Sequence, residues 1–338
     1  MSSQALNFPP GSSALVTGAT GFTGVQLTRK LCAAGVKVRA IVRPSSNLGE
    51  LAELPIEWFR GQVYDAALIE KAAEGVDYIF HVAAAYREAK IKDVDYTNVH
   101  IVSTKHLFNA IKGRANFKRF IHISTVGVHG HIEHPPANEE APFAPGDIYQ
   151  ETKAEAELWL REACAKAQVP FTVIRPAAIY GPGDRRLLKI FKLAQAPLFP
   201  ILGFGKCLYH LIHVQDLTNI IALAAVSPSA ANEVLICGNR ESVTLVQIGG
   251  WVAAECGKKL RVVRIPAWPF FLLGGICEAI WKPLGKEPPL YRRRVAFFTK
   301  DRSFDTSKLQ QKLDYQYTYS NEEGVRQTAR WYLENGWM

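Results

Sequence analysis

The sequence predicts an α/β protein with a doubly wound parallel sheet and a smaller C-terminal substrate-binding lobe. A glycine-rich turn follows an apolar run near the N-terminus, and strand-like and helical patterns alternate from about 14 to 175. Beyond Tyr180, prolines, glycines and aromatic residues replace that alternation. Such alternation is typical of a parallel sheet covered by helices. We therefore expect a Rossmann-type nucleotide-binding domain over 12–180, with elements returning to it at about 208–240, and a mainly substrate-binding lobe over 181–338.

The first predicted element is an apolar strand over 14–16, followed by a glycine-rich turn and a helical pattern that Gly35 closes. Gly18 permits a tight bend, Gly21 permits a pyrophosphate to approach the backbone, and Gly24 permits the helix to pack on the strand. The N-terminus of a helix also favours a bound anion. The cofactor-binding residues predicted for this turn are Gly18, Thr20, Gly21, Phe22, Thr23 and Gly24.

The second predicted strand, 36–42, ends in Arg43, which lies 25 positions after Gly18. An acidic residue near this position holds the ribose 2′-hydroxyl of NAD, whereas an arginine accommodates the 2′-phosphate of NADP. A guanidinium group also suits bidentate contact with phosphate better than an ammonium group does. The sequence therefore predicts NADP as the cofactor, with NAD as the alternative.

Tyr149 and Lys153 lie four residues apart in a helical pattern, so their side chains share one helix face. A neighbouring positive charge lowers the pKa of a phenol and permits it to act as a general base near neutral pH. Upstream, an apolar strand over 120–123 ends in Ser124 and Thr125. Hydroxyl groups at the carboxyl end of a parallel strand lie where ligands bind in open α/β sheets.

The order and spacing of further motifs extend this pattern over about 300 residues. The chain resembles the extended short-chain dehydrogenase/reductases, a group of NAD(P)-dependent enzymes that includes nucleotide-sugar epimerases and dehydratases, 3β-hydroxysteroid dehydrogenases and dihydroflavonol reductases. The segments that carry the resemblance are 17–24, 75–84, Asn98 with Thr104, 124–130, Tyr149 with Lys153, 175–183, 213–216, and 304–315.

The resemblance implies a role for each matching residue. Tyr149 is implied as the acid/base, Lys153 as the residue that lowers its pKa and binds ribose, and Thr125 or Ser124 as the hydroxyl that polarises the substrate oxygen. Asn98 is implied to support the lysine through a water relay. The other cofactor contacts that the resemblance implies are Gln62, Val63, Ala83, Ala84 and Pro176.

Two positions depart from the family pattern. The family has Gly-Asp-Leu after its third strand, with the aspartate on the adenine amino group. This chain has Gln62 and Val63 there, so the Gln62 amide oxygen has to accept that hydrogen bond. The second departure is His129, where the family often has a tyrosine before Gly130.

Charge and composition exclude several other classes. The net charge is +9, but no nucleic-acid motif and no basic stretch interleaved with aromatic residues accompanies it, so no nucleic-acid partner is predicted. His129, His131 and His134 lie close together in a segment with two prolines, and they lack the spacing of a zinc site, so no metal is predicted. The N-terminus lacks the pattern of a signal peptide, which predicts a cytoplasmic protein.

The segment 265–281 is rich in apolar and aromatic residues, and its unbroken apolar run over 267–277 is too short to span a bilayer. The sequence favours a helix buried in the lobe. The alternative is an exposed flap that enters the membrane interface, which would make the protein peripheral at the membrane. With Phe199 and Phe204 nearby in the sequence, the lobe suits a sterol-like or other lipid-like alcohol. The resemblance also implies a homodimer.

These observations lead to one main hypothesis and two alternatives. The main hypothesis is an NAD(P)-dependent oxidoreductase that interconverts a secondary alcohol and a ketone on a bulky, largely apolar substrate. The first alternative is a nucleotide-sugar epimerase or dehydratase, in which hydride leaves and returns within one turnover. The second alternative is a non-catalytic NADP-binding sensor or scaffold, against which the intact pair of Tyr149 and Lys153 argues.

Overall fold

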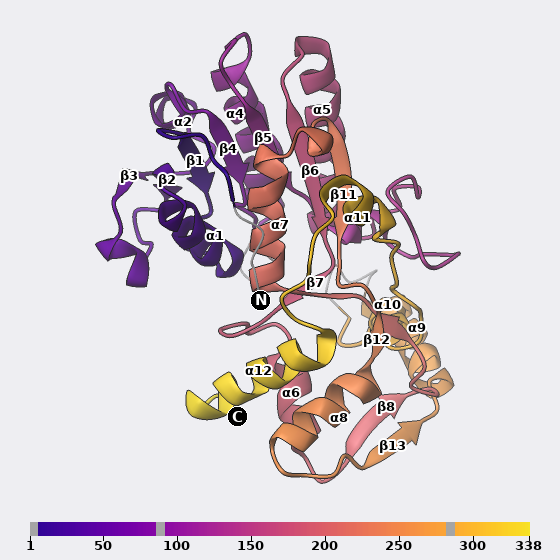
Figure 1. Ribbon diagram of the computed structural model, residues 1–338. Coiled ribbons are helices and arrows are strands. Elements are labelled where there is room, and N and C mark those ends of the chain that lie inside the picture. The colour runs from indigo at the N-terminus through magenta and orange to yellow at the C-terminus, as the bar shows by residue number, and fades with distance from the viewer. Residues whose placement is uncertain (1–5, 86–91, 282–287) are drawn as a thin grey trace.

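The computed structural model describes residues 6–85, 92–281 and 288–338. Its central feature is a seven-stranded sheet with the order β11-β6-β5-β4-β1-β2-β3, in which all neighbouring strands are parallel (Figure 1). The predicted α/β fold with a Rossmann-type sheet is confirmed. The seven strands are β1 (Ser13–Thr17), β2 (Lys37–Val42), β3 (Ile56–Arg60), β4 (Tyr78–His81), β5 (Arg119–Ile123), β6 (Phe171–Pro176) and β11 (Glu233–Cys237).

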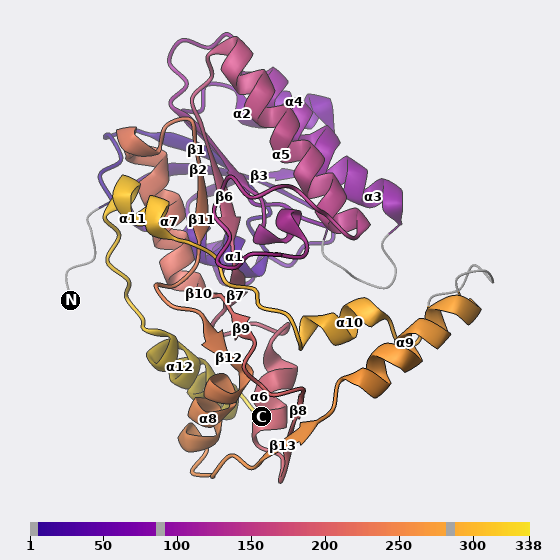
Figure 2. The same cartoon turned by 90° about the vertical axis from the view of Figure 1, so that its right-hand side faces the viewer.

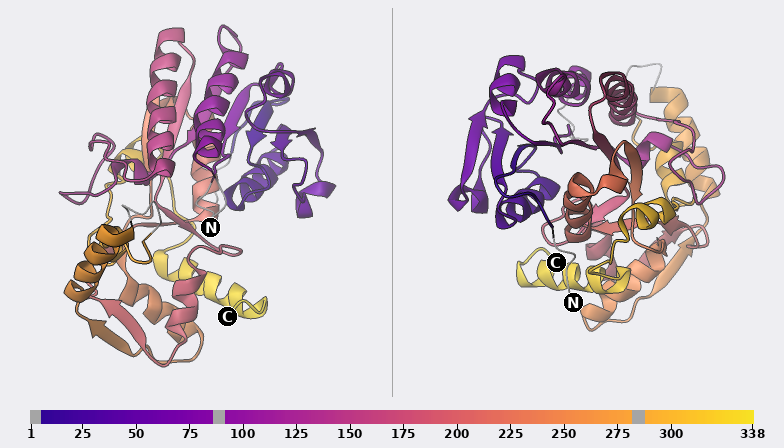
Figure 3. Two further views of the ribbon diagram at one scale, coloured as in Figure 1. Left: turned by 180° about the vertical axis from the view of Figure 1, so that it is seen from behind. Right: turned by 45° about the horizontal axis from the view of Figure 1, so that its top comes forward.

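Helices cover both faces of the sheet, as the continuous burial of the central strands requires (Figure 3). Apolar side chains of the sheet and its helices form two separate cores, one on each face. One face carries α1 (Phe22–Ala33), α7 (Val214–Val226) and α11 (Ser307–Leu313). The other carries α2 (Ala66–Ala73), α4 (Ser103–Ile111) and α5 (Ile148–Ala167). Two short helices precede α4, namely α3 (Asp93–Thr97) and a π-helical turn, η2 (Asn98–Val102).

The strand order changes direction between β1 and β4, which positions the ligand-binding edge of the sheet. The chain passes from β1 outward to β2 and β3, then returns to β4 on the other side of β1. The segments after β1 and β4 therefore diverge, and a crevice at the carboxyl ends of the strands is where ligands bind in such sheets. The glycine-rich turn follows β1, so it lies at this edge.

The C-terminal lobe lies below the sheet in Figure 1 and has its own apolar core, which includes Phe191, Phe199, Val252 and Tyr332. Its helices are α6 (Leu188–Ala194), α8 (Leu245–Glu255), α9 (Trp268–Trp281), α10 (Arg292–Phe297) and α12 (Asn321–Glu334). Outside the main sheet the described residues form three two-stranded sheets: β7 (Ala178–Tyr180) with β10 (Leu211–His213), β9 (Leu208–Tyr209) with β12 (Val243–Thr244), and β8 (Phe199–Leu202) with β13 (Val262–Ile265). The 3-10 turns are η1 (Gly49–Glu53), η3 (Val126–His129) and η4 (Pro228–Ala230).

The expectation that the apolar segment 265–281 forms a buried helix is wrong. Its helix, α9, extends away from the body of the lobe beside α10 (Figure 2), and Gly274 is its one buried residue. Gly274 and Gly275 face α10 so closely that a Cβ on Gly274 would lie 2.9 Å from the Arg292 nitrogen. Two glycines therefore take part in the contact with α10, whereas Trp268, Leu272, Leu273, Ile276 and Ile280 are exposed. Among the described residues, no helix has the length and apolar character to span a membrane.

Candidate active site

The glycine-rich turn is built so closely that side chains cannot replace two of its glycines. Gly18 has a φ of +73°, and a Cβ there would lie 2.7 Å from the Ala83 nitrogen. A Cβ on Gly24 would lie 1.9 Å from the Gly18 carbonyl oxygen. The backbone of the turn thus passes between β4 and α1, and the α1 N-terminus opens at the sheet edge without a side-chain cap. This geometry fits the diphosphate of a dinucleotide.

The residues between these glycines lie at the start of α1, where a second turn approaches them. Gly21 is the N-cap of α1, and its N–H donates to the Gly18 carbonyl at 3.0 Å. The Arg186 guanidinium lies over the Phe22 ring, 5.3 Å from its centroid. Thr20 and Thr23 are partly exposed beside them. The Arg186 side chain therefore lies beside the first residue of α1, next to the predicted phosphate site.

Arg43 directly follows β2 and is exposed at the same edge of the sheet. A second arginine, Arg60, ends β3 opposite Val42, and its Nη1 donates to the Pro44 carbonyl at 3.2 Å. Two arginines thus follow or end neighbouring strands at this edge, where sequence reasoning named one. The basic residue at the end of the third strand was the available signal. Gln62 and Val63 follow Arg60 and lie beyond the end of β3.

Helix α5 carries the predicted catalytic pair in its first two turns. The Asp147 side chain accepts from the Gln150 N–H at 2.9 Å and caps the helix, which fixes Tyr149 in the first turn. Tyr149 is partly exposed, whereas Lys153 is buried and donates from Nζ to the Ile123 carbonyl at 2.8 Å. Burial lowers the pKa of Lys153 to about 7, and the Glu157 carboxylate offsets part of this effect.

The structure separates the two hydroxyl groups that follow β5. Ser124 is buried, and its Oγ donates to Glu157 Oε2 at 2.6 Å. Thr125 is partly exposed, and its Oγ1 accepts from the Gly127 N–H at 3.0 Å, so its own hydroxyl proton can be donated to a ligand. Ser124 is therefore part of the interior, and Thr125 is the hydroxyl that remains on the open side of the strand end.

Ser124 belongs to a buried charge network that attaches α5 to the sheet. Glu157 and Arg175 are both fully buried, and Arg175 Nη2 lies 2.5 Å from Glu157 Oε1. Arg175 Nη1 also donates to the Glu139 carbonyl at 2.8 Å and to His129 Nε2 at 3.1 Å. Burial and the Arg175 charge lower the pKa of His129, consistent with a neutral ring that accepts this bond. His129 thus contributes to the network that attaches α5 to the sheet.

The remaining predicted residues lie around the same crevice. Ala83 is buried against the glycine-rich turn, and its N–H donates to Thr17 Oγ1 at 3.4 Å. Ala84 is exposed beside it. Pro176 is the last residue of β6, and Asn98 begins the π-helical turn η2. All of these residues follow the carboxyl ends of strands or lie on helices that cover them.

Sequence reasoning missed a group of buried histidines beneath Lys153. His81, His100 and His122 are each fully buried. Burial, with the nearby Lys153 charge, lowers the pKa of His81 to about 3 and that of His100 to about 2. His81 and His100 are therefore neutral at physiological pH, and their rings form hydrogen bonds with neighbouring groups. The sequence signal was the presence of single histidines at otherwise apolar strand and helix positions.

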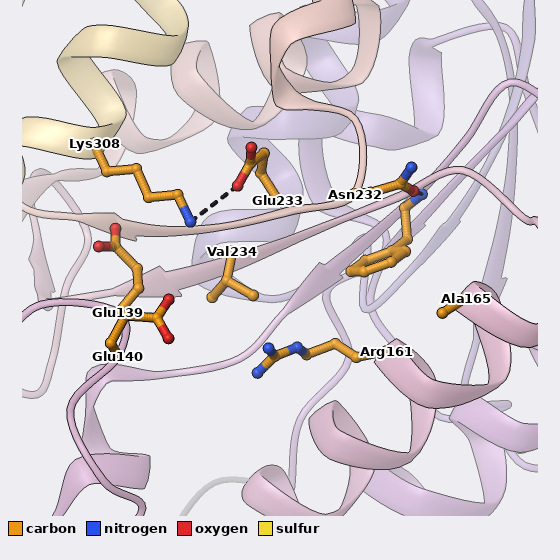
Figure 4. Close-up of a pocket in the computed structure, with 9 residues that line it drawn as sticks. Glu139, Glu140, Arg161, Ala165, Asn232, Glu233, Val234 and Lys308 are labelled. Atoms are coloured by element: carbon orange, nitrogen blue, oxygen red, sulfur yellow. Dashed lines mark hydrogen bonds and ion pairs between the residues drawn. The ribbon is translucent and has the colours of Figure 1, made fainter.

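A hollow of about 360 Å³ lies apart from the predicted site residues (Figure 4). It begins beside Asn232 and Glu233 at the start of β11, and Arg161 lines it from α5, about three helical turns beyond Tyr149. Lys308 lies 2.9 Å from the Glu233 carboxylate across it. None of the predicted catalytic or cofactor residues lines this hollow, so the chemistry is assigned to the sheet edge instead.

The chain matches the NAD dependent epimerase/dehydratase family over residues 14–238. The chain belongs to this family. The predicted resemblance to extended short-chain dehydrogenase/reductases is thereby confirmed, and the protein is an NAD(P)-dependent oxidoreductase.

Two relatives of this family member have names that refer to sterols. The chain is 32% identical over 260 residues to sterol demethylase protein B of Methylococcus capsulatus. The matched region covers 75% of this chain and 77% of that protein. The chain is 25% identical over 347 residues to 3beta-hydroxysteroid-dehydrogenase/decarboxylase isoform 1 of Arabidopsis thaliana, which covers 93% of this chain and 78% of that protein.

Solved structures share the fold over almost the whole chain. The structure of gox2253 is similar with a TM-score of 0.82 and 26% identity, covering 97% of this chain and 100% of that one. The NAD complex of dTDP-glucose 4,6-dehydratase from Bacillus anthracis is similar with a TM-score of 0.74 and 20% identity, covering 96% of this chain and 97% of that one. The second likeness is one of fold alone.

Proposed function

We propose that the protein is an NADP-preferring oxidoreductase that interconverts a secondary alcohol and a ketone on a bulky, largely apolar substrate. The observation that carries the proposal is the Lys153 contact with Ile123. This 2.8 Å hydrogen bond holds the helix that bears Tyr149 against the strand end that bears Thr125. Tyrosine, lysine and a hydroxyl group then meet at the sheet edge that also holds the glycine-rich turn.

Each of these residues has a distinct task in the proposed reaction. The bound nicotinamide supplies hydride for reduction or accepts it in oxidation. Tyr149 donates its phenol proton to the ketone oxygen in reduction and takes a proton back in oxidation. The Lys153 ammonium lowers the pKa of that phenol. The Thr125 hydroxyl donates to the same substrate oxygen, and a donor fixed in advance stabilises the charge that develops there.

The preference for NADP rests on Arg43 after β2, with Arg60 at the end of the neighbouring strand. We expect Arg43→Asp to weaken NADPH binding far more than NADH binding, because only NADPH carries the 2′-phosphate. Lys37→Asp is the matched control, since Lys37 is exposed at the opposite end of the same strand. Titration of intrinsic fluorescence with each cofactor measures both affinities. Equal losses for NADPH and NADH would remove Arg43 from the phosphate site.

An apolar substrate agrees better with the surroundings of the site than a nucleotide sugar does. A nucleotide sugar needs cationic groups for its diphosphate, and Arg185 and Arg186 are two cations that follow the turn over 181–184. Arg186 Nε lies 2.8 Å from Asp184, and the Arg185 guanidinium lies 5.1 Å from the Trp337 ring centroid. Both arginines therefore already have partners within the chain. The sterol-related relatives give the same indication.

The exposed face of α9 supports a membrane source for such a substrate. Trp268, Leu272, Ile276 and Ile280 recur every four residues, so they form one apolar stripe along the helix. Trp268 is 70% exposed. We include in the proposal that this stripe enters the interface of an anionic membrane, where exposed apolar and aromatic side chains with basic neighbours bind.

Absorbance of the reduced nicotinamide tests the proposed reaction. Purified protein with NADP⁺ is mixed with sterol-like secondary alcohols or with nucleotide sugars. Net reduction with an apolar alcohol, lost in Tyr149→Phe, is the expected result. A nucleotide sugar converted without net reduction would instead assign the protein to the epimerases and dehydratases. If a Tyr149→Phe variant keeps the full biological activity of the wild type in the cell, the protein is a sensor or scaffold rather than this enzyme.

A further inference from the structure

A π-helical turn brings His100 between the two halves of the candidate site. Residues 93–111 form one helical stretch that is widened at η2, and π-helical turns are frequent at functional sites. The Ser103 Oγ donates to the Val99 carbonyl at 2.5 Å, and the Thr104 Oγ1 donates to the His100 carbonyl at 2.6 Å. Side chains thus satisfy carbonyls in this turn, which supports its widened geometry.

The hydrogen bonds of His100 define its tautomer. The Ala85 N–H donates to His100 Nε2 at 3.1 Å, and an amide nitrogen can only donate, so Nε2 carries no proton. His100 Nδ1 lies 2.8 Å from Thr152 Oγ1, and that hydroxyl donates to the Ile148 carbonyl at 2.7 Å. The Thr152 oxygen therefore accepts the Nδ1 proton of a neutral imidazole.

The two partners of His100 lie on different sides of the crevice. Ala85 belongs to the segment after β4, next to the alanines predicted to contact the cofactor. Thr152 lies on α5 directly before Lys153. The His100 ring also packs edge-on against the Tyr149 ring, with 5.4 Å between the centroids. One buried ring thus touches the cofactor segment, the catalytic helix and the phenol.

We propose that His100 is a positioning residue that sets the separation between the segment after β4 and helix α5. It does so with one accepted and one donated hydrogen bond, and it transfers no proton itself. The inference rests on the proposed function in that α5 carries the acid/base. A displacement of about 1 Å in a site of this kind can lower a rate about 100-fold, so the fixed separation contributes to turnover.

Three substitutions separate the two bonds of the ring from its volume. His100→Phe keeps a ring of similar size and loses both bonds. His100→Asn places an amide nitrogen near the position of Nδ1 and keeps the donor to Thr152. His100→Gln places an amide oxygen near the position of Nε2 and keeps the acceptor for Ala85. His134→Phe is the control, because His134 is exposed and is none of the predicted catalytic or cofactor residues.

We expect His100→Phe to lower kcat about 10- to 100-fold and to leave the substrate KM within about threefold of the wild type. The kcat values of His100→Asn and His100→Gln should lie between those of the wild type and His100→Phe. NADPH binding should weaken about fivefold to tenfold, as for one lost hydrogen bond. His134→Phe should leave both kcat and NADPH affinity within about twofold of the wild type. Wild-type kcat and NADPH affinity in His100→Phe would overturn the proposal.

A second readout does not depend on turnover. NMR of protein labelled with ¹⁵N-histidine should contain an Nδ1–H tautomer that stays neutral between pH 5 and 8 and is missing in His100→Phe. An Nε2–H tautomer, or a ring that titrates in this range, would contradict the inference even if the enzyme has no activity on the tested alcohols. If His100→Phe does not fold, Thr152→Val removes the hydrogen bond of His100 Nδ1 from the side of its partner and should also lower kcat.

Discussion

Lys153 shows how a single residue can serve the site at a cost to the fold. Its Nζ has a carbonyl partner in Ile123, yet burial lowers its pKa to about 7, well below the usual value of a lysine. The folded protein therefore holds this proton less tightly than the unfolded chain does. The charge that the proposed reaction needs is thus carried in the interior against a desolvation penalty.

The penalty predicts a pH-dependent effect of Lys153→Met on stability. Below about pH 7 Lys153 is charged in both states, and the cost of burying the charge is fully present. Between about pH 7 and 10.5 the unfolded chain binds more protons, so the stability of the wild type rises with pH relative to the variant. The free energy of unfolding of the variant, relative to that of the wild type, should therefore be highest near pH 6.5. This difference should fall by a few kcal/mol by pH 9.5.

Urea unfolding of both proteins at the two pH values measures this difference. Other titrating groups contribute equally to the two chains, so they cancel in the comparison. A difference in free energy of unfolding that does not change with pH would mean that Lys153 keeps an ordinary pKa.

Ser124 and Thr125 are predicted to differ sharply despite being neighbours. Ser124→Ala removes a buried donor to the Glu157 carboxylate and should cost about 1–3 kcal/mol of stability, with kcat within about threefold of wild type. Thr125→Val should lower kcat about 100-fold or more, because it removes the donor to the substrate oxygen. Thr125→Ser should restore activity. The reverse pattern of losses would assign the catalytic role to Ser124.

The sequence predicted the residues with a local signal and missed those whose partners are remote. Tyr149 and Lys153 are recognisable from their spacing of four. His100 gave no such signal, because its partners Ala85 and Thr152 lie 15 and 52 positions away. A π-helical turn also leaves no trace in a periodicity of 3.6 residues.

At the scale of elements, the same distinction separates α1 from α9. Helix α1 was predictable because its strand, turn and helix are consecutive, and Gly18 and Gly24 each meet a close backbone contact. Helix α9 is apolar on most sides, so composition could not reveal which face would pack. In the structure Gly274 and Gly275 lie against α10, and Trp268, Leu272 and Ile276 are among the exposed side chains.

The apolar stripe of α9 predicts binding to anionic membranes. Exposed basic residues lie nearby: Arg264, whose Nε bonds to the Phe204 carbonyl at 3.3 Å, and Arg292, whose guanidinium lies against Gly275. The wild type should float with vesicles that contain phosphatidylglycerol and bind weakly to pure phosphatidylcholine. The double substitution of Leu272 and Ile276 by Glu should abolish flotation.

Leu333→Glu makes the same kind of change on α12, at another exposed leucine, and should leave flotation unchanged. Light scattering of the same proteins provides the competing outcome. If the α9 variant dissociates a dimer and the wild type does not bind vesicles, a second copy of the chain covers the stripe and the membrane assignment is wrong.

At the scale of the whole molecule, the strand order positions every part of the candidate site. The order β11-β6-β5-β4-β1-β2-β3 brings the segments after β1, β2, β4 and β5 to one edge, although they are distant in the sequence. Alternation of strands and helices predicted this arrangement because it extends along the whole domain. The lobe was less predictable, because each of its short sheets joins segments far apart in the chain, such as β8 with β13.

The most direct test follows hydride itself. NADPH that carries deuterium at the transferable C4 position is incubated with the protein and an apolar, sterol-like ketone, and the product alcohol is examined by mass spectrometry. An oxidoreductase of this kind should place one deuterium on the carbinol carbon for each NADPH oxidised, and Tyr149→Phe should abolish the transfer. Deuterium that stays on the nicotinamide while a nucleotide sugar is epimerised or dehydrated would contradict the proposed function.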